Sequence, residues 1–456
     1  MPCGAGDKRL LGHRCHRCRR DHLKCDGNRP CGRCSRKKVD CNSSEPARSN
    51  LQVVYYSHPD SSTIPREVPA DQTQHYAQTF FFAMGLSPTL LSAFSAQSIG
   101  SLLCDHRLTQ EAISVLGGLY ACSNPSLLSL PRVAKRELTA RWLSLQERIE
   151  EGLQKPQEAD FDGILASALL LSFAHLLADT SGNSWRSWIY QVHTFAEWHN
   201  VVGLKTCRRK SLLRLARILD AFAALCLQED IDLVLAPRWN ELGLRMCQLQ
   251  SIGQPQPMQG RDQFLDYFVN DLEMWAKIQY WMITWVRHIN QLDGRNGRPS
   301  TDTPSEYELR GIELSCIASR FQRDVIAIIT WYTSWADAGA TSSILPLYHC
   351  ISVDISRMFC DPSWLSLNCH LPAMERQVRH AQATSVLQLV ENSVSHLHLE
   401  AIIYAPTLYI VGLEMKNKPE RDRILQIIYR LKQKGFSVIE RFESTLQDSW
   451  QGLDLF

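Results

Sequence analysis

The sequence predicts a mainly all-α protein built from a small cysteine-rich module, a flexible linker and a large helical domain. Cysteines and basic residues gather in the first 41 residues, and beyond residue 75 long segments carry apolar residues at helical spacing. A chain of 456 residues with 45% hydrophobic content can bury one large core besides a small module. We expect a basic arm over residues 1–14, the module over 15–41, the linker over 42–74 and the helical domain over 75–456.

Charge is distributed unevenly along the chain. The whole sequence has 49 Lys and Arg against 47 Asp and Glu, a formal net charge of only +2. Residues 8–41 alone hold twelve Lys and Arg and three Asp and Glu, a balance of +9, which leaves −7 on the rest. This asymmetry indicates that a polyanion binds at the amino-terminal end, although a solvated basic tail would have the same composition.

Six cysteines of the module form an internal repeat, CxxC followed by six residues and a third Cys. A shift of sixteen positions superimposes the first triplet on the second, that is Cys15, Cys18 and Cys25 on Cys31, Cys34 and Cys41. A two-residue gap lets both sulfurs of a CxxC pair reach one tetrahedral zinc ion at about 2.3 Å. Because six cysteines cannot fill the eight positions around two zinc ions, two thiolates must be shared. The repeat therefore predicts a binuclear Zn²⁺ cluster.

Folding of the module should depend on this metal, because Leu23 and Val39 are its only sizeable apolar candidates. Two other cysteine chemistries fit less well. A disulfide framework needs an oxidising compartment, whereas residues 1–11 are polar and lack the apolar segment of a signal peptide. An iron–sulfur site accounts neither for the duplicated spacing nor for the basic side chains.

The run from Arg14, RCHRCRRDHLKCDGNRPCGRCSRKKVDC, resembles the Zn2Cys6 binuclear cluster of fungal transcription factors at every metal position. Pro30 matches the loop proline of that family, and residues 25–27 match its CDG turn. The resemblance implies that Cys15 and Cys31 bridge the two metals. It also implies that the module binds double-stranded DNA, with a helix over the major groove.

The residues expected to contact DNA are basic or polar. Each half should form a short helix after its CxxC pair. The first helix can present side chains to guanine O6 and N7, whereas the second half is expected at phosphates. The family usually has a basic pair where this sequence has Asp21 and His22, which is expected to alter the preferred DNA sequence. The candidates are Arg17, Arg19, Arg20, His22 and Lys24 in the first half and Arg36, Lys37 and Lys38 in the second.

The segment beyond residue 75 predicts a dozen or more helices in one domain. The clearest lie over residues 130–153, 160–177, 212–227, 264–289, 307–335 and 421–446. This part resembles the fungal-specific transcription factor domain, with a weaker echo over 185–198. The resemblance rests on PTLYIVGLEMKNKPERDRILQIIYRLKQKGFSVIERFESTLQDSW, which includes Pro406, Gly412, Arg421 and Trp450.

Catalytic motifs are missing from the sequence, which has no GxSxG, HExxH, GxxxxGK, GxGxxG or DDxxD pattern. We therefore expect no enzyme. The aromatic stripe of the body is interpreted as core packing, although it could line a small-molecule pocket. The histidines are interpreted as core or surface residues rather than ligands, and the cysteines between residues 104 and 369 as small buried apolar residues. The stripe is Trp275, Tyr280, Trp281 and Trp285, and the histidines are His175, His193 and His199.

The resulting hypothesis is a nuclear, sequence-specific regulator of RNA polymerase II genes that binds GC-containing promoter sites. The family points to a metabolic or secondary-metabolite gene cluster, and to the transcription machinery or co-regulators as partners. The linker lacks apolar heptads, so a homodimer would form through the helical domain. The apolar segment 164–177 is too short to cross a membrane, and no membrane is expected. A helical enzyme or metabolite-binding module with an appended zinc segment, and a co-regulator that does not bind DNA, remain alternatives.

Overall fold

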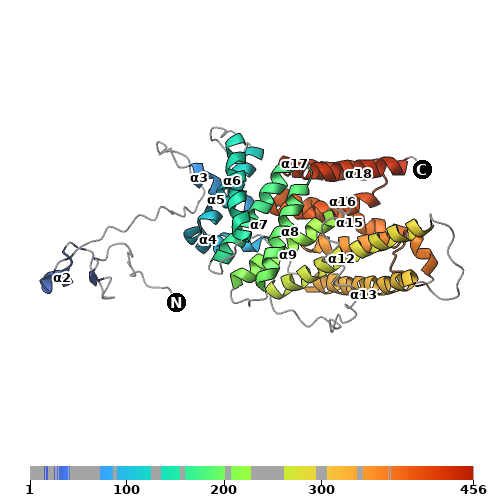
Figure 1. The fold of residues 1–456 in the computed structure, drawn as a ribbon, viewed down its shortest axis with the longest axis horizontal. Helices are drawn as coiled ribbons and strands as arrows, with labels where there is room; N and C mark the ends of the chain where they lie inside the picture. The colour runs from blue at the N-terminus through green and yellow to red at the C-terminus, as the bar shows by residue number, and fades with distance from the viewer. Residues whose placement is uncertain are drawn as a thin grey trace, which may run out of the picture. The chain divides into compact units, whose positions relative to one another are not determined.

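A computed structural model describes residues 15, 17–18, 25, 28, 30–39, 41, 72–85, 90–124, 135–154, 160–200, 207–226, 261–293, 306–335, 343–367, 369 and 371–454. Every regular element in these ranges is a helix, which confirms the predicted fold class (Figure 1). The chain divides into two compact units, residues 1–68 and 69–456. Residues 42–71 of the predicted linker lie outside the described residues. Helix α3 begins at Gln72, so its first turn takes in residues predicted to belong to the linker.

The first unit contains α2 (Gly32–Arg36), and the second unit contains a succession of helices of very different lengths. In chain order these are α3 (Gln72–Met84), η1 (Ser92–Phe94), α4 (Ala96–Asp105), α5 (Arg107–Ser123), α6 (Lys135–Gln154), α7 (Phe161–Ala178), α8 (Asn183–Asn200), α9 (Cys207–Cys226), α12 (Arg261–Asp293), α13 (Glu306–Trp335), α14 (Leu345–Met358), η6 (Pro362–Leu367), α15 (Arg376–His396), η7 (Leu399–Tyr404), α16 (Ala405–Glu414), α17 (Lys418–Gln433) and α18 (Ile439–Asp454).

Helix α7 is a core helix of the second unit. It is apolar on all sides, and it packs against α5, α6, α8 and α9. The indole N–H of Trp188 on α8 donates to the Ala168 carbonyl at 2.8 Å, which fixes α8 against α7. By length and composition α7 could cross a membrane, but 89% of that stretch is buried in the unit. The prediction of a core helix here is confirmed.

Helices α3 and α5 approach each other closely because α5 carries glycine at the contact. A Cβ atom on Gly117 would lie 1.9 Å from the Tyr76 carbonyl oxygen, which no side chain can tolerate. The neighbouring Gly118 gives similar room to Leu138 of α6, whose Cδ2 would lie 2.7 Å from a Cβ. Two glycines thus set the spacing of three helices.

The long helix α12 supplies the aromatic stripe, and its burial confirms that the stripe is core packing. Trp275 is fully buried, and its indole N–H donates to Asp354 of α14 at 2.8 Å. Trp285 stacks on Trp364 of η6 with ring centroids 4.0 Å apart. His175 and His193 are also buried in the core.

The predicted helix over residues 421–446 is wrong as a single element, because it is two helices, α17 and α18. Gly435 takes the left-handed backbone conformation with φ of +94°, and its N–H donates to the Lys432 carbonyl at 2.8 Å, which ends α17. The following turn is held against α7 by the Ser437 hydroxyl, which donates to the Leu177 carbonyl at 2.7 Å. Apolar residues continue at helical spacing through the break, so periodicity alone joined the two helices.

The other predicted helices are present with shifted ends. Helix α9 begins at Cys207, five residues before its predicted start, because a polar first turn carries no apolar signal. The interpretation of the scattered cysteines is partly wrong. Cys350 is buried, but Cys122, Cys316 and Cys360 are exposed, since spacing in the sequence does not show whether a single residue faces the core.

Candidate metal centre

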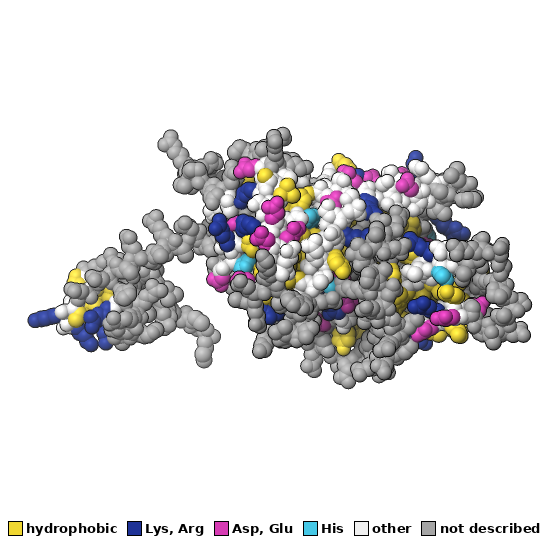
Figure 2. Space-filling model, viewed as in Figure 1, with side chains coloured by type: hydrophobic (Ala, Val, Ile, Leu, Met, Phe, Trp, Pro, Cys, Tyr) yellow, Lys and Arg dark blue, Asp and Glu magenta, His cyan; other side chains and the backbone are white. Residues whose placement is uncertain are grey.

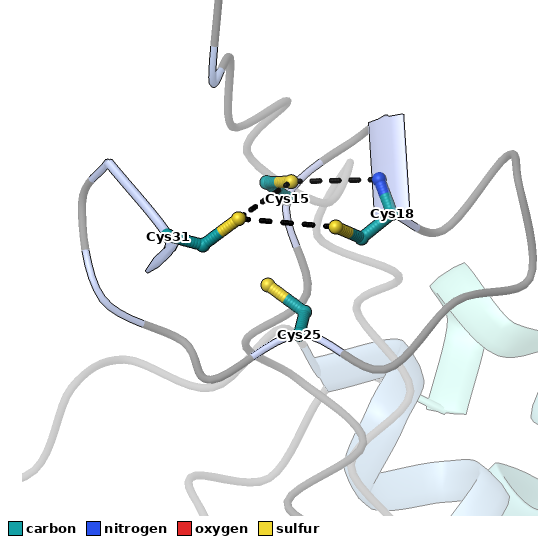
Figure 3. Close-up of side chains that lie close together, drawn as sticks. All are labelled: Cys15, Cys18, Cys25 and Cys31. Carbon is teal, nitrogen blue, oxygen red and sulfur yellow. Dashed lines mark hydrogen bonds between the residues drawn. The ribbon is translucent and has the colours of Figure 1, made fainter. Parts of the chain in front are cut away.

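The cysteines of the repeat lie together in two overlapping groups of four. Within each group the sulfur atoms lie within 4.8 Å of one another, and both groups contain Cys15 and Cys31. Figure 3 shows the sulfurs of the first group turned toward a common centre. The first group adds Cys18 and Cys25 to the shared pair, and the second adds Cys34 and Cys41.

The separations between sulfur atoms fit thiolates that surround a metal. Cys31 Sγ lies 3.9 Å from Cys15 Sγ and 3.8 Å from Cys18 Sγ, and Cys15 Sγ lies 3.7 Å from Cys34 Sγ. Zinc–sulfur bonds of about 2.3 Å in a tetrahedron place neighbouring sulfurs about 3.8 Å apart. A disulfide would need a bond of about 2.05 Å, so these pairs are not disulfides. A set of thiolates in this geometry suits Zn²⁺.

The two halves of the repeat share a backbone hydrogen bond to a cysteine sulfur. Cys31 is the N-cap of α2, and its sulfur accepts a hydrogen bond from the Cys34 N–H at 3.4 Å. In the first half the Cys15 sulfur accepts from the Cys18 N–H at 3.5 Å. The two CxxC pairs therefore share the same N–H···S hydrogen bond between their cysteines.

We predicted that a helix follows each CxxC pair. In the second half this is wrong, because α2 already starts inside the pair and includes Cys34. The physical reason is that a thiolate can act as the N-cap acceptor, where the exposed N–H groups of a helix favour negative charge. The sequence could have predicted this helix start, since the first and last residues of CxxC have the spacing of an N-cap and its N3 residue. A third bond of this kind joins the Cys31 N–H to the Cys41 sulfur at 3.3 Å.

The thiols differ in how readily they ionise. Hydrogen bonds from the Cys18 and Cys34 backbone N–H groups lower the pKa of Cys15 and Cys31, respectively. Burial raises the pKa of Cys18 to about 12, and the neighbouring thiols Cys15 and Cys31 add to the rise. Six thiolates at these distances would repel one another, so they cannot all be ionised unless cations compensate their charge. The six cysteine sulfurs thus suit divalent cations, and Zn²⁺ would supply the compensating positive charge.

In the second half of the module, the chain turns back after α2 so that Val39 packs against the cysteines. Lys38, which follows α2, has a left-handed backbone with φ of 50°, and this turns the chain back. The Val39 N–H then donates to the Cys34 carbonyl at 3.1 Å, and its partly buried side chain packs against the cysteines. Val39, one of the two apolar candidates of the module, is therefore partly buried against the cysteines, whereas Leu23 lies outside the described residues.

The described surface of the module is basic. The side chains of Arg17, Arg36, Lys37 and Lys38 are exposed, and the described residues of the module include no carboxylate (Figure 2). Arg36 also contacts its own helix, where its Nε donates to the Gly32 carbonyl at 3.2 Å. The other predicted contacts lie outside the described residues and stay predictions, namely Arg19, Arg20, His22 and Lys24.

A comparison with known proteins finds a match for the cysteine module and for no other part of the chain. No curated protein and no solved structure matches the chain. Residues 13–50 match the family model of the fungal Zn(2)-Cys(6) binuclear cluster domain, and the matched segment contains all six cysteines of the repeat. The match and the two overlapping sulfur groups together identify residues 13–50 as a zinc-binding and DNA-binding domain of the fungal zinc-cluster type of transcription regulator.

Proposed function

We propose that this chain is a sequence-specific regulator of RNA polymerase II genes that binds promoter DNA through residues 15–41. The observation that carries the proposal is the pair of four-sulfur groups inside the segment that matches the fungal zinc-cluster domain. The exposed basic side chains beside these groups support it, because contacts between basic side chains and phosphates supply a large share of the affinity of DNA-binding proteins.

Each zinc ion takes four of the six cysteines in this proposal. One ion binds Cys15, Cys18, Cys25 and Cys31, and the other binds Cys15, Cys31, Cys34 and Cys41, so Cys15 and Cys31 bridge. Membership of both sulfur groups supports the bridging role of these two residues. Six thiolates and two Zn²⁺ carry a formal charge of −2, which the surrounding Arg and Lys side chains offset.

DNA contacts divide between the two halves. Arg17, with Arg19, Arg20, His22 and Lys24, reads base edges in the major groove, and Arg36, Lys37 and Lys38 bind phosphates. The exposure of Arg17 and of the three residues at the end of α2 supports this assignment.

The cellular role follows from the type of domain. The protein acts in the nucleus on a metabolic or secondary-metabolite gene cluster, and the helical body contacts the transcription machinery or co-regulators. A homodimer would form through the same body. The basic runs of residues 17–20 and 36–38 have the composition of a nuclear import signal.

Selection of bound sequences from random DNA with the full zinc-loaded chain tests the proposal. We expect a short GC-containing motif to be enriched, and we expect Cys18→Ser to abolish the enrichment because it removes a ligand. Lack of enrichment with the native chain would refute sequence-specific binding. Equal enrichment with both chains would show that DNA binding does not need the cluster.

Salt dependence separates a DNA-binding protein from a co-regulator that uses the cluster for protein contacts. We expect the logarithm of the affinity for the selected site to fall linearly with the logarithm of salt concentration, by about 0.9 per phosphate neutralised. Lys37→Gln should reduce that slope by about one phosphate without changing the preferred sequence. A native affinity that does not depend on salt would refute the phosphate contacts.

A further inference from the structure

Arg33 is a basic residue of the zinc module that is not among the predicted DNA contacts. It lies in α2 between two cysteines of the repeat, and its side chain is partly buried. Its carbonyl accepts from the Lys37 N–H at 3.1 Å, and Arg36 follows it by three residues. Residues three and four positions apart lie on one face of a helix. Arg33 therefore shares a face of α2 with Arg36 and Lys37, two of the residues proposed to bind phosphates.

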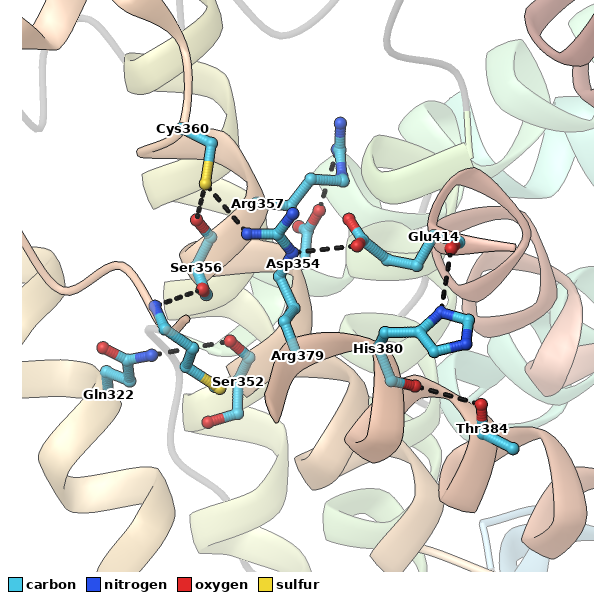
Figure 4. A network of polar contacts seen from close by, with 11 residues as sticks. Gln322, Ser352, Asp354, Ser356, Arg357, Cys360, Arg379, His380, Thr384 and Glu414 are labelled. Atoms are coloured by element: carbon cyan, nitrogen blue, oxygen red, sulfur yellow. Dashed lines mark hydrogen bonds and ion pairs between the residues drawn. The ribbon is translucent and has the colours of Figure 1, made fainter. Parts of the chain in front are cut away.

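The guanidinium of Arg33 makes no hydrogen bond or ion pair within the part of the chain that the structure describes. Arginines of the helical body differ in this respect. Arg379 donates from Nε to Glu414 at 2.9 Å, and Arg357 donates to Asp354 at 3.0 Å (Figure 4). Each of these two arginines is bonded to a carboxylate of the body, whereas the guanidinium of Arg33 is available to an anion from outside the described residues.

The sixteen-residue repeat gives Arg33 an equivalent in the first half of the module. Arg17 follows Cys15 by two residues, as Arg33 follows Cys31. Both arginines are helical, and each directly precedes a cysteine whose N–H donates to the sulfur of the first cysteine of its pair. The two arginines therefore have equivalent positions in the repeat, and Arg17 is already proposed to contact DNA.

Phosphate is the anion that double-stranded DNA offers to such a group. A guanidinium can donate two parallel hydrogen bonds to two oxygens of one phosphate. Partial burial of the Arg33 side chain restricts its motion, so less conformational entropy is lost when a phosphate binds. Arg36 and Lys37 add positive charge on the same face of α2, which strengthens its attraction for the DNA backbone.

We propose that Arg33 binds a phosphate of the DNA backbone and is a further DNA contact of the second half of the module. The inference rests on the proposed function, since it needs DNA bound through residues 15–41. A competing role for Arg33 is to offset the negative charge of the six thiolates around two Zn²⁺. The two roles differ in what the loss of the charge affects, which is DNA affinity in the first and zinc retention in the second.

Salt titration of DNA binding tests the contact, with the full zinc-loaded chain and the DNA site that it selects. At about 0.15 M salt we expect Arg33→Gln to weaken binding about five-fold, because one phosphate is no longer neutralised. The slope of the logarithm of affinity against the logarithm of salt concentration should become shallower by about 0.9. The preferred sequence should not change, because a phosphate contact carries no sequence information.

Two control variants isolate the contribution of Arg33. Arg33→Lys keeps the charge, so it should keep the native slope although it loses the paired hydrogen bonds. Lys418→Gln removes a positive charge from an exposed position of α17 in the second unit, and it should change neither the slope nor the affinity. A slope that Lys418→Gln reduces as much as Arg33→Gln would show a general effect of net charge and would overturn the assignment.

Zinc retention separates a DNA contact from charge compensation. Native mass spectrometry should show the same zinc content in Arg33→Gln as in the native chain, and both should transfer zinc to a chelator equally fast. Zinc loss in Arg33→Gln, or a slope as steep as the native one, overturns the assignment. In both of these cases the native chain still binds DNA in a salt-dependent way, so the proposed function stands. If the native chain itself shows no salt dependence, the proposed function fails and the assignment of Arg33 fails with it.

Discussion

The zinc module and the helical body keep their shapes by different physical means. The described buried residues of the module are cysteines, of which Cys31 is fully buried and Cys34 is 3% exposed. The body instead buries large side chains such as Trp188, Trp275 and Trp364. Metal ligation replaces a hydrophobic core in the first unit, whereas the second has core enough to fold without metal. Because each unit is stabilised by its own means, we expect a perturbation of one unit to leave the other folded.

Loss of a thiolate that we propose bridges both zinc ions should have the largest effect. In Cys31→Ser we expect both zinc ions to be lost and DNA affinity to fall more than about 100-fold, because each ion loses a ligand and the module unfolds. Cys25→Ser, which removes a ligand from one group only, is the matched control and should retain more zinc. Native mass spectrometry of the full chain measures the stoichiometry.

The melting temperature of the body should stay the same in both cysteine variants. A parallel loss of body stability in Cys31→Ser would contradict the independence of the two units. Equal zinc content in the two variants would contradict the bridging assignment.

Crowding at α5 should have the next largest effect, confined to the body. Gly117→Ala should destabilise the second unit by about 2–3 kcal/mol, because the added Cβ meets the Tyr76 backbone and the helices must separate. Gly100→Ala on α4 is the control, since a Cβ there meets nothing within 4 Å and should stabilise the helix by about 0.5–1 kcal/mol. Urea unfolding followed by circular dichroism measures both, and equal effects would contradict the close approach of α3 and α5.

A buried carboxyl should make the stability of the body depend on pH. Burial raises the pKa of Asp271 to about 7, Asp324 adds to the rise, and the Tyr348 hydroxyl donates to its Oδ2 at 2.8 Å. The folded state then holds a proton that the unfolded state releases near pH 4. This stabilising contribution is complete below pH 4 and disappears as pH rises through 7.

We expect Asp271 to add about 2 kcal/mol of stability at pH 5.5 relative to pH 8. Asp271→Asn keeps an acceptor for Tyr348 and should remove that part of the pH dependence. Urea unfolding of both chains at the two pH values measures it. An unchanged pH dependence in Asp271→Asn would show that this carboxyl does not titrate on unfolding.

The turn between α17 and α18 should have the smallest effect of the set. Ser437→Ala removes the hydrogen bond to the Leu177 carbonyl and should cost about 1 kcal/mol. Ser385→Ala, at an exposed position of α15, loses only a bond to its own helix and should cost less than about 0.5 kcal/mol. Thermal unfolding compares the two, and equal costs would mean that the turn is not anchored to α7 through this hydroxyl.

Short sequence patterns were sufficient to predict those features that depend on residues close together in the chain. The sixteen-residue cysteine repeat predicted two overlapping ligand sets, because ligand number and spacing constrain zinc so strongly. Periodicity likewise found α7, α12 and α13, whose apolar residues run long enough to be unambiguous. It joined α17 to α18, because a single Gly435 does not interrupt an apolar pattern.

By itself, the sequence determined the metal, the six ligands and the helical class of the body, since each follows from residue types at short spacing. Only the tertiary structure decided which polar groups lack partners. Ser172 and Ser352 look alike in the sequence, yet one buried hydroxyl is bonded within its helix and the other has no hydrogen-bond partner among the described residues. That distinction depends on side-chain orientation and on neighbours from distant helices, and no local pattern encodes it.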